Sequence, residues 1–577
     1  MSPIRPVRPV TLATVVACAC LASQAIGGKS IETDPIIRVL ATEADYALNN
    51  LVASDGAKPY YIAYTITETQ NVSISAVLGA LRSDDRNQSR VLDVDRRVGD
   101  YHLDNTHKIR EGGYSFDFFD FFGGATEISL EDDIEAIRQQ IWLATDRAFK
   151  RAARKHARVL TNIKVKVEEE DKSDDFSREE PNVFGQDPVS LSFDGDEWAQ
   201  RLRKHSARFR RHPLIYSSGV SLSASATNRY MVNTEGTRLR TGRKLVRLSI
   251  HAATKAEDGM DLFQRHLFNT ASESALPDDA TIDAALQKVI DQVLGLRAAP
   301  LVEPYTGPAI LVNRASGVFF HEIFGHRIEG HRQKDVEEGQ TFTKKIGQLV
   351  LPEFLSVIDD PTQARFGGVD LRGHYQYDDE GVAARPVTLV EDGVLKTFLL
   401  SRSPVEGFPQ SNAHGRREPG HDVVSRQGNL IVRSSKHVPF DELQHELLRL
   451  CKDQDKPYGM LFEDISGGFT STGRRGPQSF KVLPIIVYRV YADGRPDELV
   501  RGVDIVGTPL SCFDKIVLTA DDDAVFNGTC GAESGWVPVS AVSPSILVSQ
   551  IEIEKRQRDQ DKPPILPAPI AETMEGA

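Results

Sequence analysis

The chain has no excess of basic residues, no long apolar run beyond its N-terminus and few cysteines. Its 577 residues include 82 acidic and 69 lysine or arginine side chains, a net charge of −13. This balance argues against a nucleic-acid-binding protein, which normally presents a basic face. No internal stretch approaches the ~20 apolar residues of a membrane-spanning helix. Internal repeats and glycine-rich phosphate loops are also absent from the sequence.

Cysteine is scarce, with five in the whole chain: Cys18, Cys20, Cys451, Cys512 and Cys530. The first two lie in the apolar N-terminal stretch described below, so three would remain in an exported protein. An odd number leaves one cysteine unpaired. Metal ligation would explain a free Cys530, whereas the other two either pair or are simply buried.

The first 25 residues have the pattern of a secretory signal peptide. Arg5 and Arg8 precede a short apolar stretch at residues 11–21, and small residues follow up to Ala25. We therefore expect export to the periplasm, with cleavage after Ala25. The alternatives are lipoprotein processing at Cys18, or a disordered N-terminal tail on a cytoplasmic protein.

Apolar periodicity predicts an α+β chain with two domains. The N-terminal α+β domain, residues 26–303, is expected to hold an antiparallel sheet with helices. The C-terminal domain, residues 304–556, is expected to be mainly antiparallel β, because its strand-like runs contain few helices. The polar, acidic segment 168–182 is expected to be a loop or a mobile linker. Residues 557–577 are proline-rich and expected to be disordered.

Individual elements follow from the same patterns. Helices are expected at residues 36–52, 129–160 (with a capping box at Ser129), 196–212, 281–296 and 439–451. Strands are expected at residues 60–67, 71–81, 90–103, 309–312, 349–358, 387–398, 428–432, 459–465, 480–491 and 516–519, and a hairpin at 214–239. Residues 112–124 are expected to form an aromatic, glycine-rich loop whose phenylalanines pack against the core, with lining a cleft or docking a partner as the alternatives.

The stretch Gly317–Gly330, GVFFHEIFGHRIEG, carries two histidines and a glutamate within an expected buried helix. His321 and His326 are five residues apart, whereas the familiar His-Glu-x-x-His zinc motif spaces them by four. At ~3.6 residues per turn, five residues separate two side chains by about 140°. A π-type turn, eased by Gly325, would align both imidazoles for one metal ion. Two ordinary buried histidines beside a solvated Glu322 are the alternative, and spacing alone does not decide.

A third ligand has to come from elsewhere in the chain. Cys530 stands in a glycine-rich turn, Asn527-Gly528-Thr529-Cys530-Gly531, before a strand-like run. A cysteine in such a turn would be able to reach across the fold and offer a thiolate. His331 is the main rival ligand, although it follows Gly330, where the helix is expected to end.

Together these features resemble the TldD/PmbA metallopeptidases, whose catalytic members carry His-Glu-x-x-x-His and a distant C-terminal cysteine. The resemblance covers about residues 232–554. Further landmarks appear in the family order: Ile358-Asp359-Asp360, then Tyr377-Asp378-Asp379-Glu380-Gly381, then Gly415-Arg416-Arg417-Glu418 and the turn at Cys530.

The resemblance implies zinc ligation by His321, His326 and Cys530, with Glu322 as the catalytic acid/base. It also implies a two-domain TldD/PmbA-like fold and a dimer, commonly with a sister subunit that lacks the metal motif. The expected function is zinc-dependent hydrolysis of unfolded or short peptides. The alternatives are a non-catalytic peptide-binding subunit and a hydrolase of non-peptide amides.

Three further residues are candidates for substrate binding. Arg416 and Arg417 would bind a peptide carboxylate through paired hydrogen bonds, and Asp379 would hold substrate or orient a ligand. The alternatives are structural salt bridges for the arginines and a plain Asp-rich turn for residues 378–380.

Overall fold

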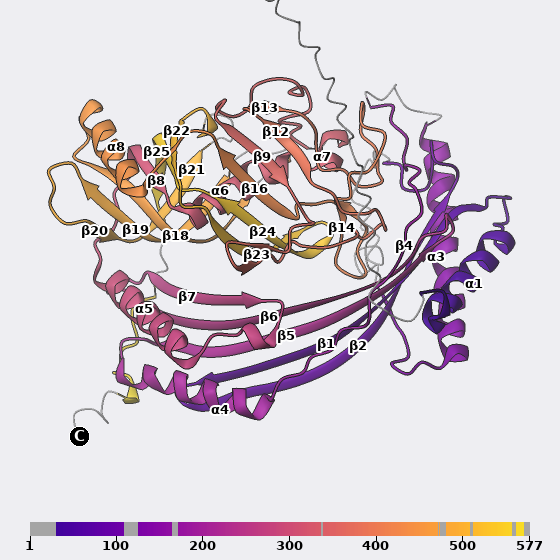
Figure 1. Cartoon of the computed structure of the whole chain (residues 1–577), viewed down its shortest axis with the longest axis horizontal. Helices are drawn as coiled ribbons and strands as arrows, with labels where there is room; N and C mark the ends of the chain where they lie inside the picture. The colour runs from indigo at the N-terminus through magenta and orange to yellow at the C-terminus, as the bar shows by residue number, and fades with distance from the viewer. Residues whose placement is uncertain are drawn as a thin grey trace, which may run out of the picture.

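The computed structural model describes residues 31–108, 125–163, 171–335, 338–470, 472–473, 480–507, 512–556 and 561–570 (Figure 1). The predicted signal peptide and the aromatic loop 112–124 lie outside these residues. The fold is α+β, as expected, with three large sheets and few helices. Within the described ranges, no helix is long and apolar enough to cross a membrane.

The N-terminal half is built on one curved, seven-stranded sheet. Its strands follow the order β3-β2-β1-β5-β6-β4, with β7 also paired to β6. All neighbours are antiparallel except β4 and β6, which are parallel. The strands are β1 (Pro59–Val77), β2 (Ala80–Val98), β3 (Thr126–Glu127), β4 (Val183–Gly185), β5 (Ser217–Asn233), β6 (Arg238–Lys255) and β7 (Asp261–Thr270).

Two long hairpins form the centre of this sheet. The hairpin expected at 214–239 is confirmed, with its turn between Asn233 and Arg238, but β6 continues to Lys255, well beyond the predicted end. The other hairpin differs from the expectation of three strands at 60–67, 71–81 and 90–103. β1 continues through the polar residues 68–70 and turns at Leu78-Gly79, where both φ angles are positive (48° and 80°). Two residues with positive φ suit a two-residue hairpin turn. The prediction divided β1 because residues 68–70 are polar.

The four N-terminal helices among the described residues cover the same face of the sheet. Even-numbered residues of β5 face them: Val220, Leu222 and Ala224 pack against α4 and α5, and Tyr230 and Val232 pack against α1 and α3. The odd-numbered residues point to the opposite face, where the C-terminal half lies (Figure 1). The helices are α1 (Pro35–Asn50), α3 (Ile134–Ile163), α4 (Gly195–Ser206) and α5 (Asp279–Ala298), with short 3-10 turns at Ile31–Thr33, Ala207–Arg211 and Glu273–Ala275.

Helix α3 starts five residues later than the predicted capping box. Asp133, not Ser129, caps it, because the Asp133 carboxylate accepts from the amide of Ala136 at 3.0 Å. The Ser129 hydroxyl instead contacts the backbone of Glu131 within a turn. Serine and aspartate are both preferred as N-cap residues, so the sequence does not decide whether the helix begins after Ser129 or after Asp133.

The described part of the acidic segment, from Asp171, has little regular structure, as expected for a loop, but its residues are held by contacts with both halves, unlike a mobile linker. Phe176 is 1% exposed. The guanidinium carbons of Arg97 and Arg402 lie 3.6 Å and 3.9 Å from the centre of its ring. Ser177 donates from its amide to the carbonyl of Arg402 at 2.8 Å. The segment therefore joins the N-terminal sheet to the C-terminal half.

The described residues of the C-terminal half form two large sheets and two short two-stranded sheets, β10-β11 and β14-β15. The six-stranded sheet has the order β13-β12-β9-β16-β24-β23, with only β16 and β24 parallel. The eight-stranded sheet has the order β17-β22-β25-β21-β19-β18-β8, with β20 paired to β19. β25 also pairs with β8, which closes a ring of strands. The mainly antiparallel β architecture predicted for this half is therefore present.

The bounds of these strands are β8 (Tyr305–Leu311), β9 (Leu355–Asp359), β10 (Arg365–Phe366), β11 (Val369–Asp370), β12 (Val387–Glu391), β13 (Val394–Leu395), β14 (Gly415–Arg416), β15 (Val424–Ser425), β16 (Asn429–Ser434), β17 (His437–Val438), β18 (Tyr458–Thr470), β19 (Phe480–Tyr491), β20 (Glu498–Val500), β21 (Val503–Gly507), β22 (Ile516–Ala520), β23 (Ala524–Ala532), β24 (Gly535–Ser543) and β25 (Ile546–Lys555). Helix α8 (Phe440–Asp453) packs on β8 and β18.

A buried helix, α6 (Asn313–Ile323), lies between the two C-terminal sheets. It packs against β18 of the eight-stranded sheet and against β23 and β24 of the six-stranded sheet (Figure 1). Val318, Phe319 and Phe320 are each at most 1% exposed and belong to the largest hydrophobic core. This packing fixes the helix that carries His321 and Glu322.

Candidate metal centre

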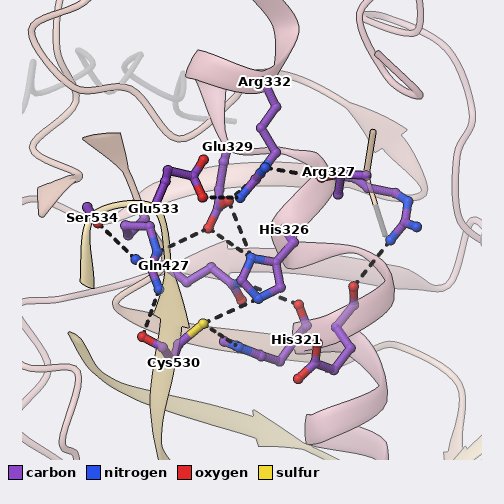
Figure 2. Close-up of polar contacts among 12 residues, drawn as sticks. His321, His326, Arg327, Glu329, Arg332, Gln427, Cys530, Glu533 and Ser534 are labelled. Atoms are coloured by element: carbon purple, nitrogen blue, oxygen red, sulfur yellow. Dashed lines mark hydrogen bonds and ion pairs between the residues drawn. The ribbon is translucent and has the colours of Figure 1, made fainter. Parts of the chain in front are cut away.

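The helix that carries His321 ends earlier than the sequence suggests. α6 stops at Ile323, a 3-10 turn covers Gly325–Arg327, and α7 (Gly330–Lys334) begins where the helix was expected to end. The predicted π-type turn is therefore wrong. The chain leaves the helix between the two histidines instead, and this break turns His326 back toward His321 (Figure 2).

The break depends on a close approach of the backbone to Gln427. A Cβ atom at position 325 would overlap Oε1 of Gln427, so only glycine fits there. The same Gln427 donates from Nε2 to the carbonyl of His321 at 3.3 Å. One side chain from a distant loop thus contacts both the helix and the turn that follows it. No local pattern in the sequence shows such a contact.

Three side chains converge at this point (Figure 2). Nε2 of His321 and Nε2 of His326 each lie 3.3 Å from Sγ of Cys530, which comes from β23. All three ligand atoms lie within 4.8 Å of one another, and the residues are buried, with 6%, 6% and 8% exposure. Tetrahedral zinc, with bonds of about 2.0–2.3 Å, would separate a nitrogen from a sulfur ligand by about 3.5 Å. The cluster therefore fits one metal ion with three protein ligands.

The charges in this cluster favour a thiolate. Burial alone would raise the pKa of Cys530, but His326 and His321 lower that pKa well below its usual range. Burial alone would likewise lower the pKa of both histidines, and the Cys530 thiolate outweighs it and raises them. The thiolate is the form of cysteine that binds metals.

Glu329 completes the surroundings of His326, and the sequence reasoning missed it. Its carboxylate is fully buried and lies 3.2–3.3 Å from Nδ1 of His326. A carboxylate on one ring nitrogen orients a histidine so that the other nitrogen faces a metal. Arg332 donates to Glu329 at 2.8 Å and Arg426 lies 3.6 Å away. Burial raises the pKa of Glu329, but His326 and Arg332 lower it to about 2. The His-x-x-Glu spacing was the available signal.

Arg426 also fixes the strand that carries the cysteine. It is 1% exposed and donates to the carbonyl of Cys530 and to Oγ of Ser534, both at 2.8 Å. The thiolate is therefore held from its backbone, rather than carried on a free loop.

Glu322 follows His321 on α6 and is 8% exposed. Its side chain packs against β18, where a Cβ atom on Gly468 would lie 2.8 Å from Cγ of Glu322. Glycine at this position leaves room for the glutamate beside the cluster. Arg327 donates to the backbone carbonyl of Glu322 at 3.3 Å, which links the end of α6 to the following turn.

The rival ligand and the other cysteines lie outside the cluster. Nε2 of His331 contacts the carboxylate of Glu533 at 2.6 Å. Cys451 and Cys512 form no disulfide bond with each other. Among the described residues, the one group with metal-ligand geometry is the His321, His326 and Cys530 set.

The candidate substrate-binding residues are held by the protein itself. Arg416 is 4% exposed and donates to the carbonyl of Gln427 at 2.5 Å. Arg417 donates from its side chain to the carbonyl of His421 at 3.1 Å and from its amide to Asp379 at 2.8 Å. Asp379 also pairs with Arg229. These contacts are those expected if the three residues have a structural role. A role of Arg416, Arg417 and Asp379 in substrate binding stays a prediction.

Comparison with known proteins identifies the family of the C-terminal half. Residues 304–555 match the model of the PmbA/TldA metallopeptidase C-terminal domain. Residues 304–555 are therefore a C-terminal domain of the TldD/PmbA family. Within it, a metalloprotease of Archaeoglobus fulgidus is 33% identical over 243 residues, which are 41% of this chain and 51% of that protein. A zinc metalloprotease TldD homolog of Saccharolobus solfataricus is 28% identical over 274 residues, covering 47% and 56% of the two chains.

These alignments thus span about half the length of the TldD/PmbA relatives. A solved structure extends the likeness of fold to most of the chain. The crystal structure of TldE from Thermococcus kodakarensis matches with a TM-score of 0.59 and 14% identity, covering 89% of this chain and 99% of that one. The two-domain α+β fold is therefore that of TldD/PmbA proteins.

Proposed function

We propose that this chain is a zinc-dependent metallopeptidase that hydrolyses unfolded or short peptides. The observation that carries the proposal is the convergence of His321, His326 and Cys530, with Glu322 beside them on α6. The metalloprotease names of its relatives support the reaction class, and the zinc metalloprotease of Saccharolobus solfataricus supports the metal.

Each group of the site would have a separate role in hydrolysis. A bound zinc ion would polarise a carbonyl and make water acidic at neutral pH. Glu322 would accept a proton from the attacking water and deliver it to the leaving amine. His321, His326 and Cys530 would leave a fourth position open for water or substrate. Glu329 would keep His326 in the tautomer that directs Nε2 inward.

The assembly and location belong to the same proposal. We infer a dimer, in which a sister subunit without the metal motif would share the substrate space. The complete His-Glu-x-x-x-His motif makes this chain the catalytic member. The signal-like residues 1–25 support export. Mass measurement of the native complex and N-terminal sequencing of the mature chain would test these two points.

The decisive experiment measures zinc per chain together with peptide cleavage, followed by mass spectrometry of the products. Wild type should hold about one zinc, and Cys530→Ala should lose both zinc and activity. Cys512→Ala is the matched control, because Cys512 lies outside the cluster. Zinc retained in Cys530→Ala would overturn the assignment of the cysteine. Peptides bound but never cleaved by the zinc-loaded chain would point to a non-catalytic subunit, and cleavage confined to other amides would change the substrate class.

A further inference from the structure

Helix α3 carries a row of basic side chains on its solvent-exposed face. Arg147, Lys150, Arg154 and Arg158, which we call the basic row, are all exposed. Their spacing of three and four residues places them along one side of the helix. Asp146 is the one acidic residue of the helix after its first turn. In a chain with a net charge of −13, the row is a local concentration of positive charge.

Contacts within the protein do not account for this row. Lys150 pairs with Asp146 at 2.8 Å, whereas Arg147, Arg154 and Arg158 form no ion pair with any residue that the structure describes. Like charges three or four residues apart weaken an α-helix. Basic residues favour a helix through its dipole only in the last turn, and the last turn of α3 has none. The row therefore weakens α3 slightly unless an outside anionic group neutralises it.

Large apolar side chains are exposed at both ends of the basic row. Trp142 and Leu143, which precede it, are 55% and 37% exposed, and Leu160, which follows it, is 42% exposed. Leu143 lies four residues before Arg147 and therefore on the same side of the helix. Trp142 and Leu160 are five helical turns apart and share one edge of the row. A face that combines basic and apolar side chains suits a surface with both negative charge and hydrocarbon.

The basic row is accessible on the outer side of the molecule. At 30 residues, α3 is about 45 Å long. It lies on the face of the sheet opposite the C-terminal half (Figure 1). The neighbouring helix α1 exposes Arg38 and Asp45, which balance each other, and Tyr46, which is 62% exposed. A flat surface in contact with this side would not cover the metal centre, which lies in the C-terminal half.

We propose that α3 docks the protein on the surface of an anionic phospholipid bilayer. The basic row would contact lipid phosphates, and Trp142 and Leu143 would enter the boundary between the headgroups and the hydrocarbon. The expected export of the chain, or its lipidation at Cys18, would bring it close to such a membrane. This inference goes beyond the proposed peptidase function, because it concerns where the protein works and not what it cleaves.

Vesicle co-sedimentation tests the proposal. The chain without residues 1–25, whose apolar stretch would itself bind lipid, is mixed with vesicles of phosphatidylcholine, with and without phosphatidylglycerol. We expect binding only to the vesicles that contain phosphatidylglycerol, and release at about 1 M salt, where the Debye length falls to about 3 Å. The triple variant Arg147→Gln, Arg154→Gln, Arg158→Gln should reduce the partition coefficient about a hundredfold, at roughly fivefold for each basic residue.

Matched variants separate the effect of charge from any effect on folding. Lysine at the same three positions keeps the charge, so this variant should bind like wild type. Glutamine in place of Arg86, Arg449 and Arg495, exposed arginines that pair with acids, removes the same charge elsewhere and should also leave binding unchanged. Trp142→Ala should weaken binding about tenfold, because the indole no longer enters the interface.

Each outcome supports or overturns the proposal. Equal binding to both kinds of vesicle, or to neither, overturns it, as does unchanged binding of the triple glutamine variant. Unchanged binding of Trp142→Ala rejects the apolar contact. Binding of heparin without binding of vesicles would show that the row receives a soluble acidic macromolecule. A triple variant that alters only the mass of the native complex would show a contact between protein subunits, and both of these results overturn the assignment to a membrane.

Discussion

At the scale of single residues, the metal cluster depends on a carboxylate that is not itself a ligand. Glu329 is fully buried and contacts His326, Arg332 and Arg426 at once. Such a network holds the imidazole in one orientation before any metal binds. Its charge is also balanced locally, by Arg332 and Arg426, so the buried carboxylate is stable in its ionised form.

Replacing this carboxylate should weaken metal binding without removing a ligand. Glu329→Gln is expected to lower zinc affinity about 10–100-fold, because the amide orients His326 less strongly. Competition with a chromophoric chelator measures the affinity. Glu353→Gln, an exposed glutamate, is the control and should bind zinc like wild type. Unchanged affinity in Glu329→Gln would mean that the neighbouring arginines, not the carboxylate, hold the ring.

Replacing Glu322 should leave zinc binding intact and reduce the rate of hydrolysis, unlike the replacement of Glu329. Glu322→Gln should retain zinc and lose about 10²–10⁴-fold in kcat, because the glutamate acts on the water proton and not on the metal. Metal analysis and peptide cleavage, measured on the same sample, separate the two effects. Cleavage at the wild-type rate would reject Glu322 as the acid/base, and loss of zinc would show instead that it is needed to bind the metal.

At the scale of elements, apolar periodicity predicted the positions of helices and strands well wherever one face of the element is buried. The helices α1 and α5 and strand β19 lie where apolar periodicity placed them, because each buries a regular row of side chains. The hairpin of β5 and β6 followed from its turn residues. The same reasoning split β1 at residues 68–70, since the sheet, not the local sequence, keeps this polar stretch extended.

The break after α6 is the clearest difference between the sequence-based prediction and the structure, and it positions His326 in the metal cluster. Two histidines five residues apart suggested a widened turn, but the contact between Gly325 and Gln427 ends the helix instead. This contact joins residues about a hundred positions apart (Gln427 also reaches His321). The residue types of the cluster could thus be predicted, whereas the backbone path that joins them could not.

The break can be tested through that contact. Gly325→Ala should lower the free energy of unfolding by about 1–3 kcal/mol, because the added methyl group overlaps Gln427. Denaturant unfolding measures the change, and zinc content should fall with it as His326 moves. The double variant Gly325→Ala with Gln427→Ala should recover part of the loss. If it recovers none, the glycine is needed for a reason other than this close approach.

At the scale of the whole molecule, the acidic segment acts as a tie between the two halves. Arg402 of the C-terminal half is 1% exposed, pairs with Glu235 of the N-terminal half at 2.7 Å and lies over Phe176. Phe176 and its neighbours are buried by partners distant in sequence. The polar, acidic composition of the segment predicted a loop or a mobile linker, because composition does not show contacts with residues distant in sequence.

Cutting this tie should affect stability more than chemistry. Arg402→Ala is expected to lower the free energy of unfolding by about 3–5 kcal/mol, since Glu235 would lose its buried partner. Protease sensitivity within residues 171–182 should rise, and proteolytic mapping would detect it. Arg449→Ala, an exposed arginine paired with Glu446, should change stability by less than about 1 kcal/mol. Equal effects of the two variants would show that the tie carries little energy.

The topology of the C-terminal half also sets an order of events during synthesis. His321 and His326 precede Cys530 by 209 and 204 residues. Strand β25, which follows the cysteine, pairs with β8, the strand that leads directly into α6. A growing chain therefore carries two of the three candidate ligands long before the third exists, and β8, the strand before α6, lacks one of its partner strands until later still. Incomplete copies, on a ribosome or left by premature termination, have no means of assembling the cluster, so its chemistry is withheld until this part of the chain is finished.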